Sequence, residues 1–182
     1  MELIIYQPLN VILIFLLLWL YFRYLGPIFI SFKKYYSWSQ KPTKAYGKAA
    51  CFDAYAAEDK VIPINQWREV SLGIAIAPLF HFYISFLKLT ITPFGNIAYK
   101  IHTRSGWAIK KGLRNHLGIV DNDYRNELTA VVYNHGSYPV KIHKGDKISQ
   151  IEFYRVPSIW MFQKKKLSKS LRGGRGFGST GK

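Results

Sequence analysis

Asp121 and Tyr124 stand close together in a short segment whose residues could do chemistry. The stretch Asp121-Asn122-Asp123 consists of residues that favour tight turns, so we expect a hairpin with Asp121 at its mouth. An ionised aspartate in such a place can take a proton from water, which makes Asp121 a candidate general base. Tyr124 would offer a flat apolar face beside it. An ordinary acidic hairpin turn is the alternative interpretation.

Two other segments carry groups that suit phosphates. Arg104, Ser105 and Gly106 combine a guanidinium, a hydroxyl and accessible backbone N–H groups in what we expect to be a turn. Gln150 follows a Gly-Asp turn and could donate a hydrogen bond to a phosphate. Each of these patterns also occurs in surface loops and hairpins that bind nothing.

The C-terminal residues 172–182 form a glycine-rich cationic tail with hydroxyl groups. Glycine lets backbone N–H groups approach phosphate oxygens closely, and arginine adds charge-assisted donors. Its candidate ligand-binding residues are Arg172, Phe177, Gly178, Ser179 and Thr180. We expect residues 163–182 to stay flexible until a ligand orders them, because they contain too few apolar side chains to fold alone.

Asp53 is the candidate metal-binding residue. Mg²⁺ keeps several of its waters when it meets phosphates, so one carboxylate can hold it through water. The alternative is a strand edge with Asp53 in the turn that follows.

The composition excludes several classes of protein. Cys51 is the only cysteine, so no intramolecular disulfide can form, and no Cys/His spacing suits a zinc deaminase. The formal net charge of +16 calls for an anionic partner or surface. A nucleic-acid-binding module would satisfy that charge, but no nucleic-acid-binding motif is present.

Residues 1–27 differ from the rest of the chain because they are hydrophobic. No charge falls between Glu2 and Arg23, and the uncharged window 3–22 approaches the roughly 20 residues that a transmembrane helix needs. Lysines follow on one side only, which would leave the rest of the chain on the cytoplasmic face of a membrane. Packing of this segment against the folded domain is the alternative.

Residues 28–162 have the pattern of an all-β domain. Short alternating segments such as 97–101 and 128–132 are separated by glycine and proline, and no long segment after residue 40 has helical periodicity with caps. Many short strands without helices predict an antiparallel barrel or sandwich.

The five candidate segments together resemble the five motifs of the trimeric dUTP diphosphatases (dUTPases). They occur in the family's order, as A-A-C-F-D-A (49–54), T-R-S-G-W-A (103–108), G-I-V-D-N-D-Y-R (118–125), G-D-K-I-S-Q (145–150) and R-G-G-R-G-F-G-S-T-G (172–181). The resemblance covers about residues 40–182. It implies a jelly-roll-like β-barrel in a homotrimer, with three active sites between subunits and the tail of one chain closing over a neighbour's site.

The resemblance also implies a role for each candidate residue. Asp121 would direct water onto the α-phosphorus of dUTP, giving dUMP and pyrophosphate, and Tyr124 would stack on the deoxyribose and exclude a 2′-hydroxyl. Asp53 would bind Mg²⁺ through water. The other implied contacts are uracil at Leu117 and Gly118, the phosphates at Arg104, Ser105, Gly106 and Gln150, and closure of the tail by Arg172, Phe177, Gly178, Ser179 and Thr180.

The chain departs from the family pattern at several positions, none of which removes a catalytic group. The unusual residues are Cys51, Ala54, Trp107, Asn126, Lys147 and Arg175. The segment 78–95 is longer than usual, and we expect an extended hairpin there.

Two alternatives to dUTP hydrolysis stay open. A related dCTP deaminase shares the barrel, but it needs a catalytic glutamate where this chain has Val131. A nucleotide-sensing or protein-binding relative with reduced catalysis is the other.

Overall fold

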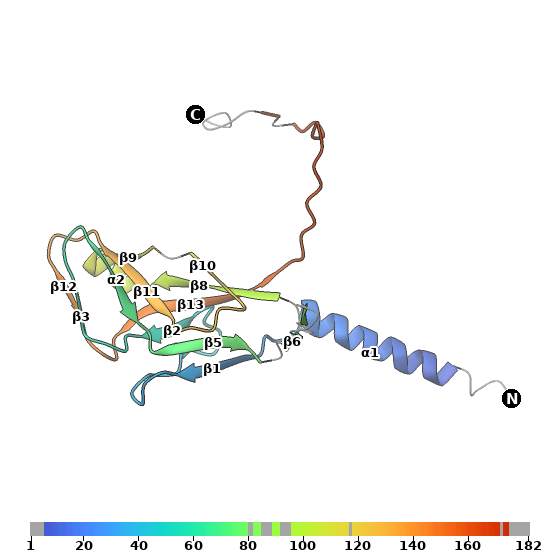
Figure 1. Cartoon of the computed structure of the whole chain (residues 1–182), viewed down its shortest axis with the longest axis horizontal. Helices are drawn as coiled ribbons and strands as arrows, with labels where there is room; N and C mark the ends of the chain where they lie inside the picture. The colour runs from blue at the N-terminus through green and yellow to red at the C-terminus, as the bar shows by residue number, and fades with distance from the viewer. Residues whose placement is uncertain are drawn as a thin grey trace.

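The computed structural model describes residues 6–79, 82–84, 89–91, 96–116, 118–171 and 173–174. An N-terminal helix leads into a β domain, and an extended C-terminal segment leaves it (Figure 1). In chain order the elements are α1 (Tyr6–Tyr24), β1 (Ile30–Lys34), β2 (Phe52–Tyr55), β3 (Lys60–Ile62), β4 (Trp67–Ser71), β5 (Ile74–Pro78), β6 (Phe82–Ile84), β7 (Leu89–Ile91), β8 (Asn96–Thr103), α2 (Ser105–Lys111), β9 (Leu113–Asn115), β10 (Ile119–Asp121), β11 (Thr129–Asn134), β12 (Val140–Ile142) and β13 (Lys147–Val156).

The strands confirm a mostly β domain, but they do not close into the barrel that we expected. Within the described residues the hydrogen-bonded sheets are separate: one has the order β10-β8-β13-β2, another β4-β11-β9, and the pairs β1–β5, β3–β12 and β6–β7 stand apart. All of the pairings are antiparallel. The separate sheets pack against one another through one cluster of buried apolar side chains.

Alternation of apolar side chains builds the core between these sheets. In β11 every second residue is buried, which brings Ala130, Val132 and Asn134 to the inner face. The amide of Asn134 is fully buried and satisfied, because its Nδ2 donates to the carbonyls of Ile62 and Tyr138 and its Oδ1 accepts from the Gly136 N–H. The buried core includes Ile62, Val70, Leu72, Ile74, Tyr99, Leu113, Leu128, Ile142 and Ile151.

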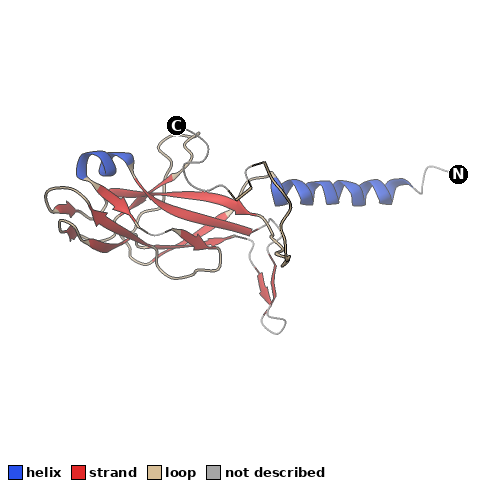
Figure 2. Cartoon of the chain, turned by 90° about the horizontal axis from the view of Figure 1, so that it is seen from above, coloured by secondary structure: helices blue, strands red, loops and turns tan. Residues whose placement is uncertain are grey.

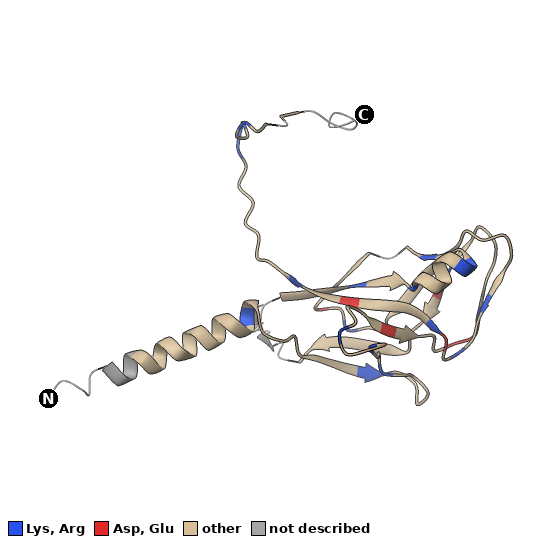
Figure 3. Cartoon of the chain, turned by 180° about the vertical axis from the view of Figure 1, so that it is seen from behind, with Lys and Arg blue, Asp and Glu red and all other residues tan. Residues whose placement is uncertain are grey.

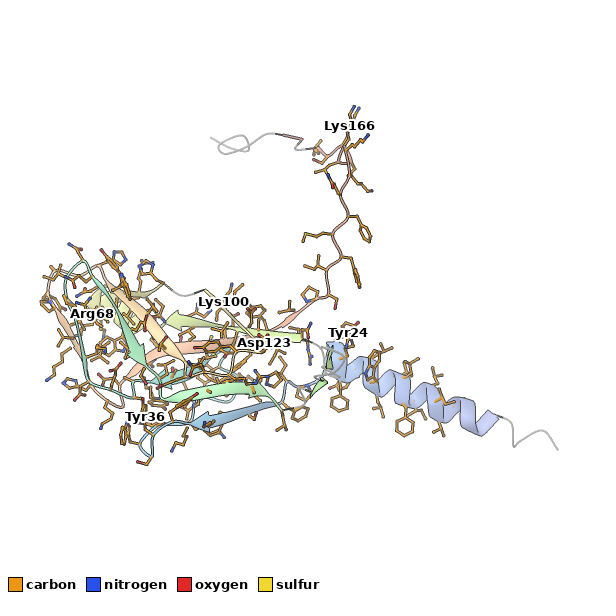
Figure 4. All side chains as sticks on the ribbon, in the orientation of Figure 1. Tyr24, Tyr36, Arg68, Lys100, Asp123 and Lys166 are labelled. Carbon is orange, nitrogen blue, oxygen red and sulfur yellow. The ribbon has the colours of Figure 1, made fainter. Side chains whose placement is uncertain are left out.

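Helix α1 projects away from the β domain, and from Val11 to Tyr21 its apolar side chains are exposed on all sides (Figure 4). It carries no Lys, Arg, Asp or Glu in its described part before Arg23 in the last turn (Figure 3). The Arg155 guanidinium of β13 donates to the carbonyls of Arg23 and Gly26, which ties the helix end to the domain.

The expected transmembrane helix is not supported. No helix among the described residues combines the length and the hydropathy that crossing a membrane requires. The fully apolar run in α1 covers only 11–22, because Gln7 and Asn10 occupy its first turns and Arg23 its last. At 1.5 Å per residue this run is about 18 Å long, against a hydrocarbon core of about 30 Å.

Residues after 40 include one short helix that the sequence pattern did not predict. Helix α2 begins after Arg104 and ends at Gly112, whose left-handed backbone (φ 68°) donates to the Ala108 carbonyl. Seven residues are too few to show a helical period, and the glycine at the end was the available signal. The expected hairpin in the segment 78–95 is confirmed in its paired strands β6 and β7.

The described part of the C-terminal tail runs away from the domain without regular secondary structure (Figure 1). Its residues 157–171 are exposed, including Trp160 at 83% and Phe162 at 81%. Lys166 lies far from the strands (Figure 4). The chain therefore leaves β13 with several large apolar side chains uncovered.

Candidate functional site

Asp121 ends the short strand β10, which pairs with β8 so that Asp121 faces Ala98. The backbone turns at once, and the Tyr124 N–H donates to the Asp121 carbonyl at 3.3 Å. The expected hairpin at this turn is wrong in one respect, because the strand that follows does not pair with β10. Strand β11 pairs with β4 and β9 instead, so the turn links two different sheets.

An open cleft of about 560 Å³ lies beside this turn, and both Asp121 and Tyr124 line it. The Asp121 side chain is exposed and makes no hydrogen bond or ion pair with any group that the structure describes. Tyr124 is 41% exposed, and its hydroxyl donates to the Glu127 carbonyl at 3.1 Å, which fixes the ring. A carboxylate that can reach water thus stands beside an anchored aromatic face.

Tyr99 is buried on β8 beside Val120, and nothing in the sequence marked it out. Its hydroxyl has no hydrogen-bond partner among the described groups. Burial, with a smaller contribution from Tyr124, raises the pKa of Tyr99 to about 12 against the opposing effect of Arg125. The phenol is therefore neutral at physiological pH.

Asp53 forms the centre of a second cluster. It lies in β2 and is 1% exposed, so the alternative interpretation that placed it in the turn after a strand is wrong. Its Oδ1 lies 3.0 Å from Arg104 Nε and 3.2 Å from Gln150 Nε2, and its Oδ2 lies 3.3 Å from Lys147 Nζ. Three elements therefore meet at one carboxylate: β2, the start of α2 and β13.

Lys147 is the member of this cluster whose part sequence reasoning missed, although its place in the Gly-Asp-Lys segment was a usable signal. Its backbone carbonyl accepts from Trp107 Nε1 at 2.8 Å and from Arg104 Nη1 at 3.2 Å. The unusual Trp107 therefore fastens α2 to the start of β13. Ser105 and Gly106 are exposed in the first turn of that helix.

The two parts of the site lie apart within one chain. Strand β8 connects them, because Ala98 faces Asp121 and Arg104 directly follows the end of the strand at Thr103. Six residues at about 3.3 Å each separate the two positions by about 20 Å. Figures 1 and 2 both place α2, which follows Arg104, at the end of the domain opposite to α1.

The structure thus brings Asp53, Arg104 and Gln150 together and does not bring Asp121 to them. Gly118 is exposed just before β10. Six predicted site residues lie outside the described residues: Leu117, Arg172, Phe177, Gly178, Ser179 and Thr180.

The described residues offer a divalent cation no ready set of direct ligands. No group of three or more His, Cys, Asp and Glu side chains lies together among them. Asp53 is a single carboxylate, and both of its oxygens already face cations. A protein-only magnesium site, which needs several oxygen ligands, does not fit this part of the chain.

Comparison with known proteins gives a consistent family. A family model described as dUTPase matches residues 38–181. The deoxyuridine 5′-triphosphate nucleotidohydrolase of Yarrowia lipolytica is 34% identical over 145 residues, covering 79% of this chain and 83% of that protein.

Solved structures share the fold. A dUTPase of Staphylococcus bacteriophage 80alpha with dUpNHpp superposes with a TM-score of 0.70 at 18% identity, covering 84% of this chain and 98% of the other. A dUTPase of phage phi11 of S. aureus, whose structure details the coordination of a structural Mg(II) ion, gives 0.63 at 15% identity, covering 77% and 99%. Because the family model matches residues 38–181, which is most of the chain, the chain belongs to the dUTPase family.

Proposed function

We propose that this protein hydrolyses dUTP to dUMP and pyrophosphate. The observation that carries the proposal is the exposed Asp121 carboxylate at a cleft that Tyr124 also lines, in a chain of the dUTPase family. The carboxylate is in place to accept a proton from water and to aim that water at the α-phosphorus. This activity would limit uracil in DNA and supply dUMP for dTTP synthesis.

The remaining site residues select and hold the substrate in this proposal. The Tyr124 ring packs on the deoxyribose and leaves no room for a 2′-hydroxyl, and the backbone at Leu117 and Gly118 pairs with uracil. Cytosine is rejected because its hydrogen-bonding edge would leave buried donors and acceptors unpaired. The phosphates are held by Arg104, Ser105, Gly106 and Gln150. The tail residues Arg172, Phe177, Gly178, Ser179 and Thr180 close over the nucleotide and exclude water.

We propose a homotrimer in which each active site is shared between subunits. The supporting observation is the separation of about 20 Å along β8 between Asp121 and Arg104 within one chain, which is too long for both to act on one triphosphate. A neighbouring chain that brings its own Asp53 cluster to the Asp121 cleft completes the site. The uncovered apolar side chains at 159–162 are consistent with contact to another subunit.

Magnesium is part of the proposal as the counter-ion of the triphosphate. When bound, it would neutralise phosphate charge and hold the phosphate chain in one conformation. The described residues do not supply its coordination sphere, so oxygen atoms of the nucleotide and water would provide most ligands. A contact of Asp53 with the ion through water is what the family resemblance implies, and the two cations that face this carboxylate argue against it.

Attachment to the cytoplasmic face of a membrane through residues 3–22 also stays a prediction. Its support is helix α1, whose apolar side chains from Val11 to Tyr21 are exposed. Arg23 at the helix end and the lysines at 33, 34, 41 and 44 provide charge that would attract anionic lipid.

Pyrophosphate release from each deoxynucleoside triphosphate, measured with Mg²⁺ and with EDTA, tests the proposed activity. We expect dUTP to be cleaved in strong preference to dCTP and dTTP, and Asp121→Asn to lower turnover by about 10²- to 10⁴-fold while dUTP still binds. In ¹⁸O-water the isotope should enter dUMP. Label in pyrophosphate would contradict attack at the α-phosphorus.

The same reactions separate the alternatives. Ammonia released from dCTP would favour a deaminase. Binding of dUTP without turnover would favour a regulatory relative that has lost catalysis.

A further inference from the structure

The Asp53 carboxylate is buried beside two cations, and its Oδ2 has the Lys147 ammonium as a neighbour but makes no hydrogen bond within the described residues. Its backbone N–H donates to the Thr43 carbonyl at 2.7 Å and its carbonyl accepts from the Thr43 N–H at 3.2 Å, so the residue cannot shift easily. Its oxygens face Arg104 Nε at 3.0 Å and Lys147 Nζ at 3.3 Å. At 1% exposure it is among the most buried polar groups described.

Two cations beside one buried carboxylate leave little room for a third. Mg²⁺ carries its own waters, and at Asp53 it would have to approach Arg104 and Lys147, whose charges repel it. An approaching Mg²⁺ would also have to displace one of these cations from its carboxylate oxygen and so give up an ion pair at a buried charge. The electrostatics of the cluster therefore oppose a role for Asp53 in holding a metal.

The cluster instead presents donors that a phosphate can use. Asp53 engages Arg104 Nε, and the Lys147 carbonyl engages Arg104 Nη1, so Nη2 is the guanidinium nitrogen without a partner among the described groups. The Tyr55 ring lies 5.7 Å from Lys147 Nζ and limits where that ammonium can move. Together, one carboxylate and two cations carry a net charge of +1 in a fixed geometry.

We infer that Asp53 is a positioning residue, which holds Arg104 and Lys147 in the geometry that binds the nucleotide's phosphates, and that it does not recruit the metal. This inference rests on the proposed function and names how that site is organised. Without the carboxylate the two cations would repel each other, and Arg104 would lose the partner that orients its Nη2 group. The effect of Asp53 on nucleotide binding should then pass through Arg104 and Lys147 and be independent of magnesium.

Calorimetric titration of the full-length protein with dUpNHpp, once with Mg²⁺ and once with EDTA, tests this assignment. We expect Asp53→Asn to weaken binding about tenfold and by the same factor in both buffers. In an Arg104→Gln background, Asp53→Asn should cause a much smaller further loss, because only its contact with Lys147 remains to be removed. A loss seen only with Mg²⁺ would overturn the inference, as would a full additional loss in the Arg104→Gln background.

Glu152→Gln is the matched control. It removes one negative charge from β13 at a carboxylate that pairs with His102 at 2.8 Å, outside the Asp53 cluster, so it reports the long-range effect of charge alone. We expect Glu152→Gln to leave dUpNHpp affinity within twofold of wild type. An equal loss in Glu152→Gln and Asp53→Asn would overturn the positioning role.

A second measurement needs no nucleotide. The Arg104 Nε–H resonance should exchange slowly with water in the wild type and in Glu152→Gln and quickly in Asp53→Asn; fast exchange in the wild type would overturn the inference. Failure of the wild type to bind dUpNHpp would refute the proposed function, while this readout would still decide the positioning of Arg104. Should Asp53→Asn not fold, Lys147→Met and Arg104→Gln must each weaken binding in EDTA, and wild-type affinity in either would overturn the inference.

Discussion

A mixture of two inactive variants should recover activity if the site is shared between chains. The perturbations are Asp121→Asn, which removes the proposed base, and Arg104→Gln, which removes a phosphate-binding cation. About 20 Å of β8 separates the two positions, so one chain does not place both on the same triphosphate. A subunit of each kind can still contribute its intact part to a joint site.

The expected recovery follows from the symmetry of a trimer. When equal amounts of the two variants assemble at random, a site is intact only if one chain supplies Asp121 and its neighbour supplies Arg104. Each condition holds for half of the chains, so about one quarter of the sites should work. The separate variants should be far lower, by about 10²- to 10⁴-fold for the lost base and about 10- to 100-fold for the lost cation.

Pyrophosphate release after joint refolding of the two variants provides the assay, with mixed assemblies isolated by two different affinity tags. Arg104→Gln mixed with Gln150→Ala is the matched control, because both side chains contact the same Asp53 carboxylate of one chain and cannot complement each other. Every isolated mixed trimer has one intact site of three, so activity of about one third of wild type is expected in the test and near zero in the control. If a verified mixed assembly has only the average activity of its parents, Asp121 and Arg104 act within one chain and our reasoning from β8 fails.

Three further predictions concern stability, the tail and the helix. The Tyr99 pKa of about 12 in the fold, against an ordinary 10, means that its contribution to stability is complete below pH 10 and is lost as pH rises towards 12. Urea unfolding should therefore show that the wild type loses about 1 kcal/mol more than Tyr99→Phe between pH 9 and 11; parallel profiles would contradict this. Deletion of residues 172–182 should sharply lower turnover and leave the trimer intact by light scattering, and unchanged turnover would rule out a lid function. Deletion of residues 1–25 should abolish sedimentation with anionic vesicles, a prediction that fails if the full-length protein itself does not bind them.

Period-two alternation was enough to predict several of the strands. The segments around Tyr99 and Val131 became β8 and β11, since alternation brings one face of each strand to the core wherever the strand pairs. The Gly145 turn and the strand after it were likewise predictable, and Gly145 has the positive φ of 90° that favours glycine. Helix α2 was missed because its seven residues are too few to show a helical period.

Which strands pair with each other could not be predicted from the local sequence pattern. The turn after Asp121 has the residues of a hairpin, yet β10 pairs with β8 and β11 pairs with β4. A turn fixes the direction of the chain over four residues, whereas the choice of partner strand depends on burial across the whole domain. The closed barrel that the family resemblance implied is not formed within the described residues, and local sequence pattern could not show this either, because it does not determine which strands pair.

The sequence by itself determined which chemical groups are present and in what order, because their types and spacing identify the candidate base, the cations and the glycine-rich tail. Only the tertiary structure decided which of them meet. It places Asp53 between Arg104 and Lys147 and sets Asp121 about 20 Å away along β8. The physical reason is that a buried charge must find its counter-charges wherever the folded sheets bring them, and separation along the chain does not report that distance.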